Sequence, residues 1–150
     1  MVQTHATEAV TRTPYLQHTS ATPQCGKSRL CEVLELVVRE PWFADRVTVS
    51  SLARKIEAIQ PTLLLDELQF IGTQHPHALE SWLRAGTARG VPVTVAGQLV
   101  DSFGAKVLCS RQSVSDSALA SRGLHISMVP TRKNLQALDE ETVERVATDF

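Results

Sequence analysis

The chain has 150 residues, of which 43% are hydrophobic and 21% charged, and its formal net charge at pH 7 is -1. This length allows one domain with a real core but not two sizeable ones. The near-zero charge gives no global indication of a nucleic-acid or anionic-membrane partner, and no apolar run approaches the ~18 residues of a membrane-spanning helix.

Two features of the sequence predict a cytoplasmic protein. The N-terminus lacks the apolar stretch of a signal peptide. The three cysteines, Cys25, Cys31 and Cys109, show no spacing typical of metal ligands, and their odd number fits reduced thiols.

Hydrophobic periodicity predicts strands that alternate with helices along most of the chain. Residues 1–13 are polar, rich in threonine and without a period, so we expect a disordered tail there. The predicted strands are 14–19, 46–49, 61–65, 91–96, 99–103, 106–110 and 124–129. The predicted helices are 27–39, 51–59 (capped by Ser50 or Ser51), 76–90, 117–119 and 139–150.

This alternation favours an α/β fold, a three-layer αβα sandwich around a mostly parallel sheet of five strands. The other two predicted strands, 91–96 and 99–103, flank a turn signal at Gly97-Gln98 and form a hairpin. Ligands of such folds bind where the carboxyl ends of the parallel strands meet, so functional residues are expected at that edge.

The segment from Thr19 to Ser28 carries the strongest functional signal. It ends in Gly26-Lys27-Ser28 between a predicted strand and a predicted helix, which is the context of a phosphate-binding P-loop. Backbone N–H groups of such a loop converge on an anion, and the helix dipole adds to the attraction. Lys27 is expected to reach the β- and γ-phosphates and Ser28 to bind Mg²⁺. Ala21 stands where the full motif begins with glycine.

A second signal is the run Pro61–Glu67, which is apolar until it ends in two carboxylates. An uninterrupted apolar run fits a central parallel strand that helices cover on both faces. At the end of this strand, Asp66 is expected to hold Mg²⁺ through water and Glu67 to orient or activate a hydrolytic water.

With these segments the chain resembles the AAA+ ATPases, the additional-strand branch of the P-loop NTPases. It is most similar to the family called domain of unknown function 3631, often attached to helicase-, primase- or mobile-element-type proteins. The resemblance covers Pro14 to about Ile126, and its specific part is Cys25–Leu30 and Pro61–Glu67. Supporting segments are Tyr15-Leu16, Glu32–Leu36, Pro41-Trp42, Ala85-Gly86, Arg89-Gly90 and Phe103–Lys106.

The resemblance implies ATP as substrate, Mg²⁺ as cofactor, and a homo-oligomer in which an arginine reaches the neighbour's nucleotide. Arg122 resembles that arginine, and the alternative is a helix-end arginine in a surface ion pair. Ser110 is the nearest match to a residue that senses the γ-phosphate. The expected catalytic residues are Lys27, Glu67 and Arg122, and the expected nucleotide-binding residues are Ser20, Thr22, Gln24, Cys25, Gly26, Lys27, Ser28, Arg29 and Ser110.

The expected organisation is a tail over 1–13, an ATPase core over 14–130, and a linker with the start of a truncated or reduced helical lid over 131–150. Three functions stay open: an ATPase motor or switch in a nucleic-acid machine, a degenerate nucleotide-binding or assembly module, and a small-molecule kinase. Ala21 and the short lid favour the second, and the carboxylate pair argues against the third. The predicted hairpin lies where some AAA+ proteins contact DNA, an analogy of fold alone.

Overall fold

In the computed structural model five strands form one sheet, and each of its pairings is parallel. The structure describes residues 2–20, 22–44, 47–66, 76–111, 117–130 and 145. In spatial order the strands are β2 (Pro41–Ala44), β3 (Thr62–Leu65), β6 (Lys106–Ser110), β1 (Tyr15–Thr19) and β7 (Gly123–Ser127). The prediction of an α/β fold around a five-stranded parallel sheet is therefore confirmed.

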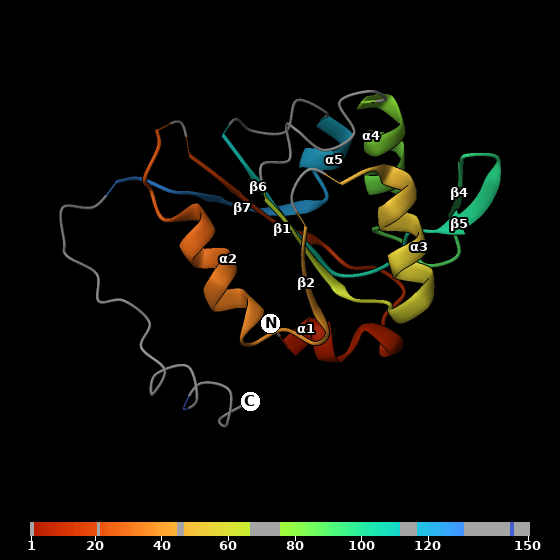
Figure 1. The fold of residues 1–150 in the computed structure, drawn as a ribbon, viewed down its shortest axis with the longest axis horizontal. Coiled ribbons are helices and arrows are strands. Elements are labelled where there is room, and N and C mark those ends of the chain that lie inside the picture. Colours follow the sequence, from red (N-terminus) through yellow and green to blue (C-terminus); the bar gives the residue numbers. More distant parts are fainter. Residues whose placement is uncertain are drawn as a thin grey trace.

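Helices cover both faces of this sheet (Figure 1). Successive side chains of a strand point to opposite faces, so Leu64 packs towards α2, while Leu63 and Leu65 pack on the other face with α3, α4 and α5. All three leucines are fully buried, as the apolar run predicted. The helices are α2 (Lys27–Glu35), α3 (Val49–Ile59), α4 (Pro76–Ala85) and α5 (Ser117–Ala120).

The second strand of the sheet lies earlier than predicted. It is Pro41–Ala44 instead of 46–49, and α2 ends at Glu35 instead of near residue 39. Proline is tolerated here because β2 is an edge strand and Pro41 is its first residue. The cap of the next helix is Thr48, whose Oγ1 accepts a hydrogen bond from the N–H of Ser51 at 3.2 Å, so α3 begins before the expected serine caps.

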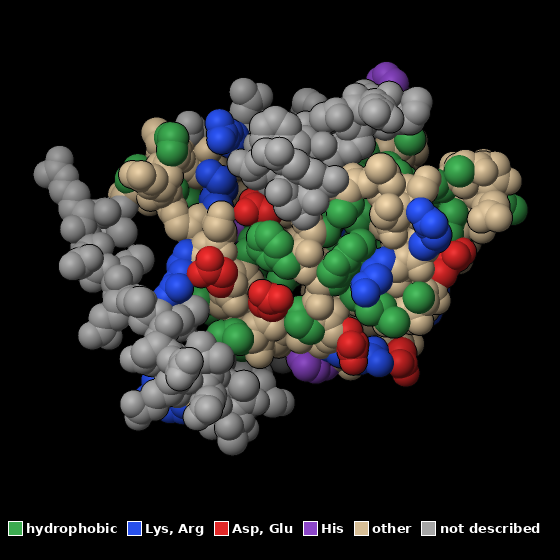
Figure 2. All heavy atoms as spheres, in the orientation of Figure 1, with side chains coloured by type: hydrophobic (Ala, Val, Ile, Leu, Met, Phe, Trp, Pro, Cys, Tyr) green, Lys and Arg blue, Asp and Glu red, His purple; other side chains and the backbone are tan. Residues whose placement is uncertain are grey.

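The predicted hairpin is confirmed as β4 (Pro92–Val95) and β5 (Gln98–Asp101), which pair antiparallel outside the main sheet. Its two turn residues, Ala96 and Gly97, both have positive φ, as a tight hairpin turn requires. On the face shown in Figure 2, Lys and Arg side chains are interspersed with Asp and Glu side chains and form no continuous basic patch.

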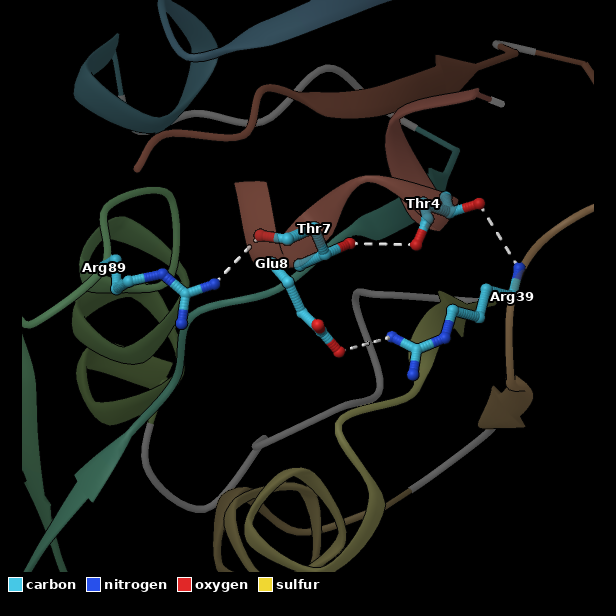
Figure 3. Close-up of polar contacts among 5 residues, drawn as sticks. All are labelled: Thr4, Thr7, Glu8, Arg39 and Arg89. Atoms are coloured by element: carbon cyan, nitrogen blue, oxygen red, sulfur yellow. Dashed lines mark hydrogen bonds and ion pairs between the residues drawn. The ribbon is translucent and has the colours of Figure 1, made fainter. Parts of the chain in front are cut away.

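The N-terminal segment differs from the predicted disordered tail. It contains the short helix α1 (Val2–His5) and the 3-10 turn η1 (Thr7–Ala9). The guanidinium of Arg89 donates to the carbonyl of Thr7 at 2.9 Å, and the N–H of Arg39 donates to Thr4 Oγ1 at 3.3 Å (Figure 3). Glu8 pairs with the Arg39 side chain at 3.6 Å. These contacts are polar, which is why hydrophobic periodicity gave no sign of them.

The expected lid over 131–150 lies outside the described residues, apart from the single exposed residue Arg145. Glu67 also lies outside the described residues. Among the described helices, none has the length and apolar content needed to cross a membrane.

One charged side chain is enclosed in the core. Lys106, at the start of β6, is 2% exposed. Its Nζ donates to the carbonyls of Ser102 at 2.7 Å and Gly104 at 3.2 Å, and it lies about 5 Å from the ring centres of Tyr15 and Trp82. Burial lowers the pKa of Lys106 to about 7, against the smaller opposing effect of Asp101.

This lowered pKa predicts a pH dependence of stability. Between pH 7 and about 10.5 the Lys106 amine is neutral in the folded chain but protonated in the unfolded chain, so the unfolded state binds more protons and stability rises with pH. Relative to a Lys106→Met variant, the free energy of unfolding of the wild type should rise by about 1.4 kcal/mol per pH unit in this window and stay level below it. Urea denaturation across the window checks this, and parallel profiles of the two proteins would contradict it.

Candidate functional site

A cavity of about 460 Å³ lies at the carboxyl ends of β1, β3 and β6. These strands are neighbours, and their register sets Ser110 at the end of β6 beside Thr19 at the end of β1. Asp66 follows the last residue of β3. Sequence positions that are far apart therefore meet at the predicted edge. The cavity is lined by Thr22, Pro23, Gln24, Cys25, Gly26, Lys27, Ser28, Arg29, Asp66, Ser110 and Arg111.

The loop between β1 and α2 turns sharply at its end. Gly26 caps α2 with a φ of 82°, a left-handed conformation that favours glycine, and its carbonyl accepts the N–H of Leu30 at 2.9 Å. Within the described part of the chain, the backbone N–H groups from Gln24 to Arg29 donate to no backbone carbonyl. Free N–H groups at the start of a helix, together with its dipole, form an anion-binding site.

Charged and hydroxyl groups border these N–H groups. Ser28 Oγ donates to Asp66 Oδ2 at 3.1 Å, which brings the two expected Mg²⁺ ligands into direct contact. Lys27 lines the same cavity, and no carboxylate among the described residues pairs with it. Its ammonium group is therefore available to an anion. Arg29 is held by Glu32 at 3.1 Å on the surface of α2.

Ser20 and Cys25 form hydrogen bonds within the loop, both to the carbonyl of Thr22. Ser20 Oγ donates to the carbonyl of Thr22 at 2.6 Å, and the Cys25 thiol donates to the same carbonyl at 3.1 Å. Hydrogen bonds from Ser20 and then Thr22 lower the pKa of Cys25, with a smaller contribution from Lys27. Ser20 thus supports the loop without lining the cavity.

Of the expected catalytic residues, Lys27 lines this cavity, Glu67 is not described, and Arg122 lies elsewhere. Glu67 lies outside the described residues, although Asp66 directly before it lines the cavity. Arg122 lies at the opposite end of the sheet, where its carbonyl accepts the N–H of Tyr15, the first residue of β1. Its Nη1 donates to the carbonyl of Arg84 at 3.3 Å.

Two residues of the cavity wall, Pro23 and Arg111, were not among the predicted site residues. Arg111 directly follows Ser110 and lines the same cavity as Lys27, where a second cation adds to the attraction for phosphate. The position of Arg111 directly after the predicted strand 106–110 was the available signal.

Sequence reasoning also missed a buried cluster behind the loop. Cys109 Sγ lies 2.8 Å from both Cys31 Sγ and His18 Nε2, and Cys31 Sγ lies 3.5 Å from His18 Nε2. Burial lowers the pKa of His18, opposed by Asp66 and assisted by Lys27, and the Cys31 hydrogen bond together with burial raises the pKa of Cys109. The cysteines lie far apart in the sequence, so their spacing could not reveal this group.

In comparisons with known proteins, no protein-family model matches the chain, and no curated protein matches it significantly.

Proposed function

We propose that this cavity binds ATP with Mg²⁺ and that the chain is a P-loop ATPase of the AAA+ type. The observation that carries the proposal is that one cavity is lined both by residues 24–29, whose N–H groups donate to no described backbone carbonyl, and by the Ser28–Asp66 pair. The place of β6 between β1 and β3 supports it, since an added strand at this place is what the resemblance to the additional-strand branch implies.

The donor set of the cavity fits Mg²⁺. This ion prefers oxygen ligands and takes few of them from the protein, and Ser28 and Asp66 supply a hydroxyl and a carboxylate at 3.1 Å from each other. Bound there with ATP, Mg²⁺ would neutralise charge on the β- and γ-phosphate oxygens.

The chain's own residues would do the remaining work. Backbone N–H groups of the loop and the Lys27 ammonium would hold the phosphates and stabilise the charge that develops on them. Arg111, directly after β6, would add a second positive charge near the phosphates. Ser110 would donate a hydrogen bond from its hydroxyl to the γ-phosphate. Glu67 would orient the attacking water for in-line displacement.

A nucleotide-binding module without hydrolysis is the second candidate. The N–H of Thr22 is bonded to Ser20 Oγ at 3.3 Å, and Pro23 has no N–H, so the first half of the loop offers fewer donors to phosphate than the second half. Mg²⁺-dependent release of phosphate by the purified chain supports the first function, and ATP binding without release supports the second.

The binding step is tested by thermal unfolding with Mg²⁺ and ATP. Because a ligand that binds only the folded state stabilises it by mass action, millimolar ATP should raise the melting temperature of the wild type. Lys27→Ala should abolish the shift, since it removes the unpaired ammonium of the cavity. Lys55→Ala is the matched control: it removes the same charge from α3, away from the cavity. No shift in the wild type would refute ATP binding.

Thiol chemistry gives a second test. We expect Cys25 to be the most reactive cysteine, because its pKa is lowered and its side chain lines the cavity with 9% of its surface exposed, whereas Cys31 and Cys109 are 0% exposed. Alkylation by iodoacetamide should add one adduct to Cys25, remove the ATP-dependent shift in melting temperature, and be slowed by bound ATP. Cys25→Ser should keep the shift after the same treatment. Retention of the shift by fully alkylated wild type would contradict the placement of the loop at the phosphates.

The proposal includes a homo-oligomer, because Arg122 is too far from the cavity of its own chain to act there. The proposal names no nucleic-acid partner; on the face shown in Figure 2, basic and acidic side chains are mixed.

A further inference from the structure

We propose that His18, Cys31 and Cys109 form a binding site for a zinc ion, directly behind the phosphate loop. The three residues come from β1, α2 and β6, and each is 0% exposed. Their donor atoms, one imidazole nitrogen and two thiol sulfurs, lie within 4.8 Å of one another. Nitrogen and sulfur are the ligands that zinc prefers in proteins.

The geometry of the cluster is compatible with a bound ion after a small adjustment. Zinc lies about 2.3 Å from sulfur and about 2.0 Å from nitrogen, so two ligands of a tetrahedral site are about 3.5–3.8 Å apart. The His18–Cys31 separation of 3.5 Å already meets this, and the two separations of 2.8 Å that involve Cys109 must grow by about 1 Å.

Charge balance selects a divalent ion. On binding, each thiol releases its proton to solvent and the sulfur donates an electron pair to the metal. Two thiolates and one neutral imidazole then balance the two charges of Zn²⁺, so the loaded site is neutral. A neutral site is the one that a fully buried position favours, because isolated charge there is costly. The three protein ligands would fill three of the four positions of a zinc tetrahedron.

The position of the ligands gives the site its role. His18 is two residues before Ser20, Cys31 is one helical turn after Lys27, and Cys109 directly precedes Ser110. A zinc ion would therefore tie together the three elements that carry the phosphate loop and the end of β6. Since the ligands lie outside the cavity wall, zinc binding does not depend on whether the chain binds ATP.

The test is metal content, which needs no assay of activity. The full chain is refolded with Zn²⁺ and a metal-free reductant, and unbound metal is removed. Native mass spectrometry then measures the mass of the protein with any bound zinc. The expected result is about one zinc ion per chain, with a higher melting temperature than the metal-free protein. Refolding with Co²⁺ should give the thiolate-to-metal absorption and the visible bands of tetrahedral cobalt.

Three variants locate the ion. Cys31→Ser and Cys109→Ser should each lose the zinc and the cobalt spectrum, and Cys25→Ser, the matched control, should retain both. Wild type that refolds without zinc would overturn the proposal even if the cluster variants fail to fold. A zinc ion lost with Cys25→Ser, or a disulfide between Cys31 and Cys109 in protein kept in reductant, would also overturn it.

Discussion

Arg122→Ala is expected to bind ATP as the wild type does but to hydrolyse it ~10³–10⁵-fold more slowly, the effect of removing an arginine that acts on phosphoryl transfer. The expectation rests on the proposed ATPase function. A change of this size would identify Arg122 as part of the reacting site, because a surface arginine in an ion pair contributes little.

The fold decides in which chain Arg122 acts. Arg122 is hydrogen-bonded to Tyr15, the first residue of β1, whereas the phosphate loop begins after Thr19, the last residue of that strand. At ~3.3 Å per residue, roughly 13 Å of strand separates these ends, which is longer than an extended arginine side chain. Arg122 therefore cannot serve the cavity of its own chain, and any catalytic role must be in a neighbouring subunit.

Mixing two inactive variants tests this arrangement. Glu67→Gln should bind ATP without hydrolysis, and it keeps Arg122. In mixed oligomers, an Arg122→Ala subunit provides an intact Glu67 and a Glu67→Gln neighbour provides the arginine, so part of the activity should return. Arg84→Ala, at the end of α4, is the control for loss of an arginine nearby. Mixed oligomers that stay inactive at every ratio would exclude Arg122 from the site.

The largest effect on stability is expected at Trp82. This side chain is 0% exposed, belongs to the core cluster between the sheet and helices α3, α4 and α5, and lies 4.9 Å from Lys106 Nζ. Trp82→Ala should lower the free energy of unfolding by about 3–5 kcal/mol, because it leaves a cavity and, below pH 7 where Lys106 is charged, removes an aromatic face from the buried ammonium.

Trp82→Phe is the matched variant. It keeps an aromatic ring beside Lys106, and the Nε1 that it removes has no hydrogen-bond acceptor among the described residues. Its loss of stability should therefore be clearly smaller than that of Trp82→Ala, as measured by urea denaturation. Equal losses for both variants would show that ring contact with Lys106 contributes nothing.

What the sequence predicted, and what it did not, follows from the range of the interactions. The β3 strand and the loop before α2 were predicted because their signals are local: three leucines in a row, and Gly26-Lys27-Ser28 after a strand. The buried cluster of His18, Cys31 and Cys109 was not predicted, because His18 and Cys31 are 13 residues apart in the sequence and Cys31 and Cys109 are 78 apart. The parallel register of β1 with β6 places His18 beside Cys109, and the packing of α2 on the sheet adds Cys31.

The N-terminal segment is a second part of the structure that the sequence did not predict. Its position depends on hydrogen bonds to Arg39 and Arg89 and on pairing of Thr13 with Thr87. Composition describes such a segment as polar and unstructured, although its polar groups find partners in residues much later in the chain. The earlier position of β2 has a similar origin, since the sheet edge accepts a proline that a helix or a central strand would exclude.

The pairing of β1 has a consequence for synthesis of the chain. β1 is synthesised well before both of its partners, β6 and β7. During translation both edges of β1 therefore stay unpaired until about residue 127 has left the ribosome. Unpaired strand edges can associate with other chains. The phosphate loop, which follows this strand, can therefore take its final form only after β6 and β7 have been made.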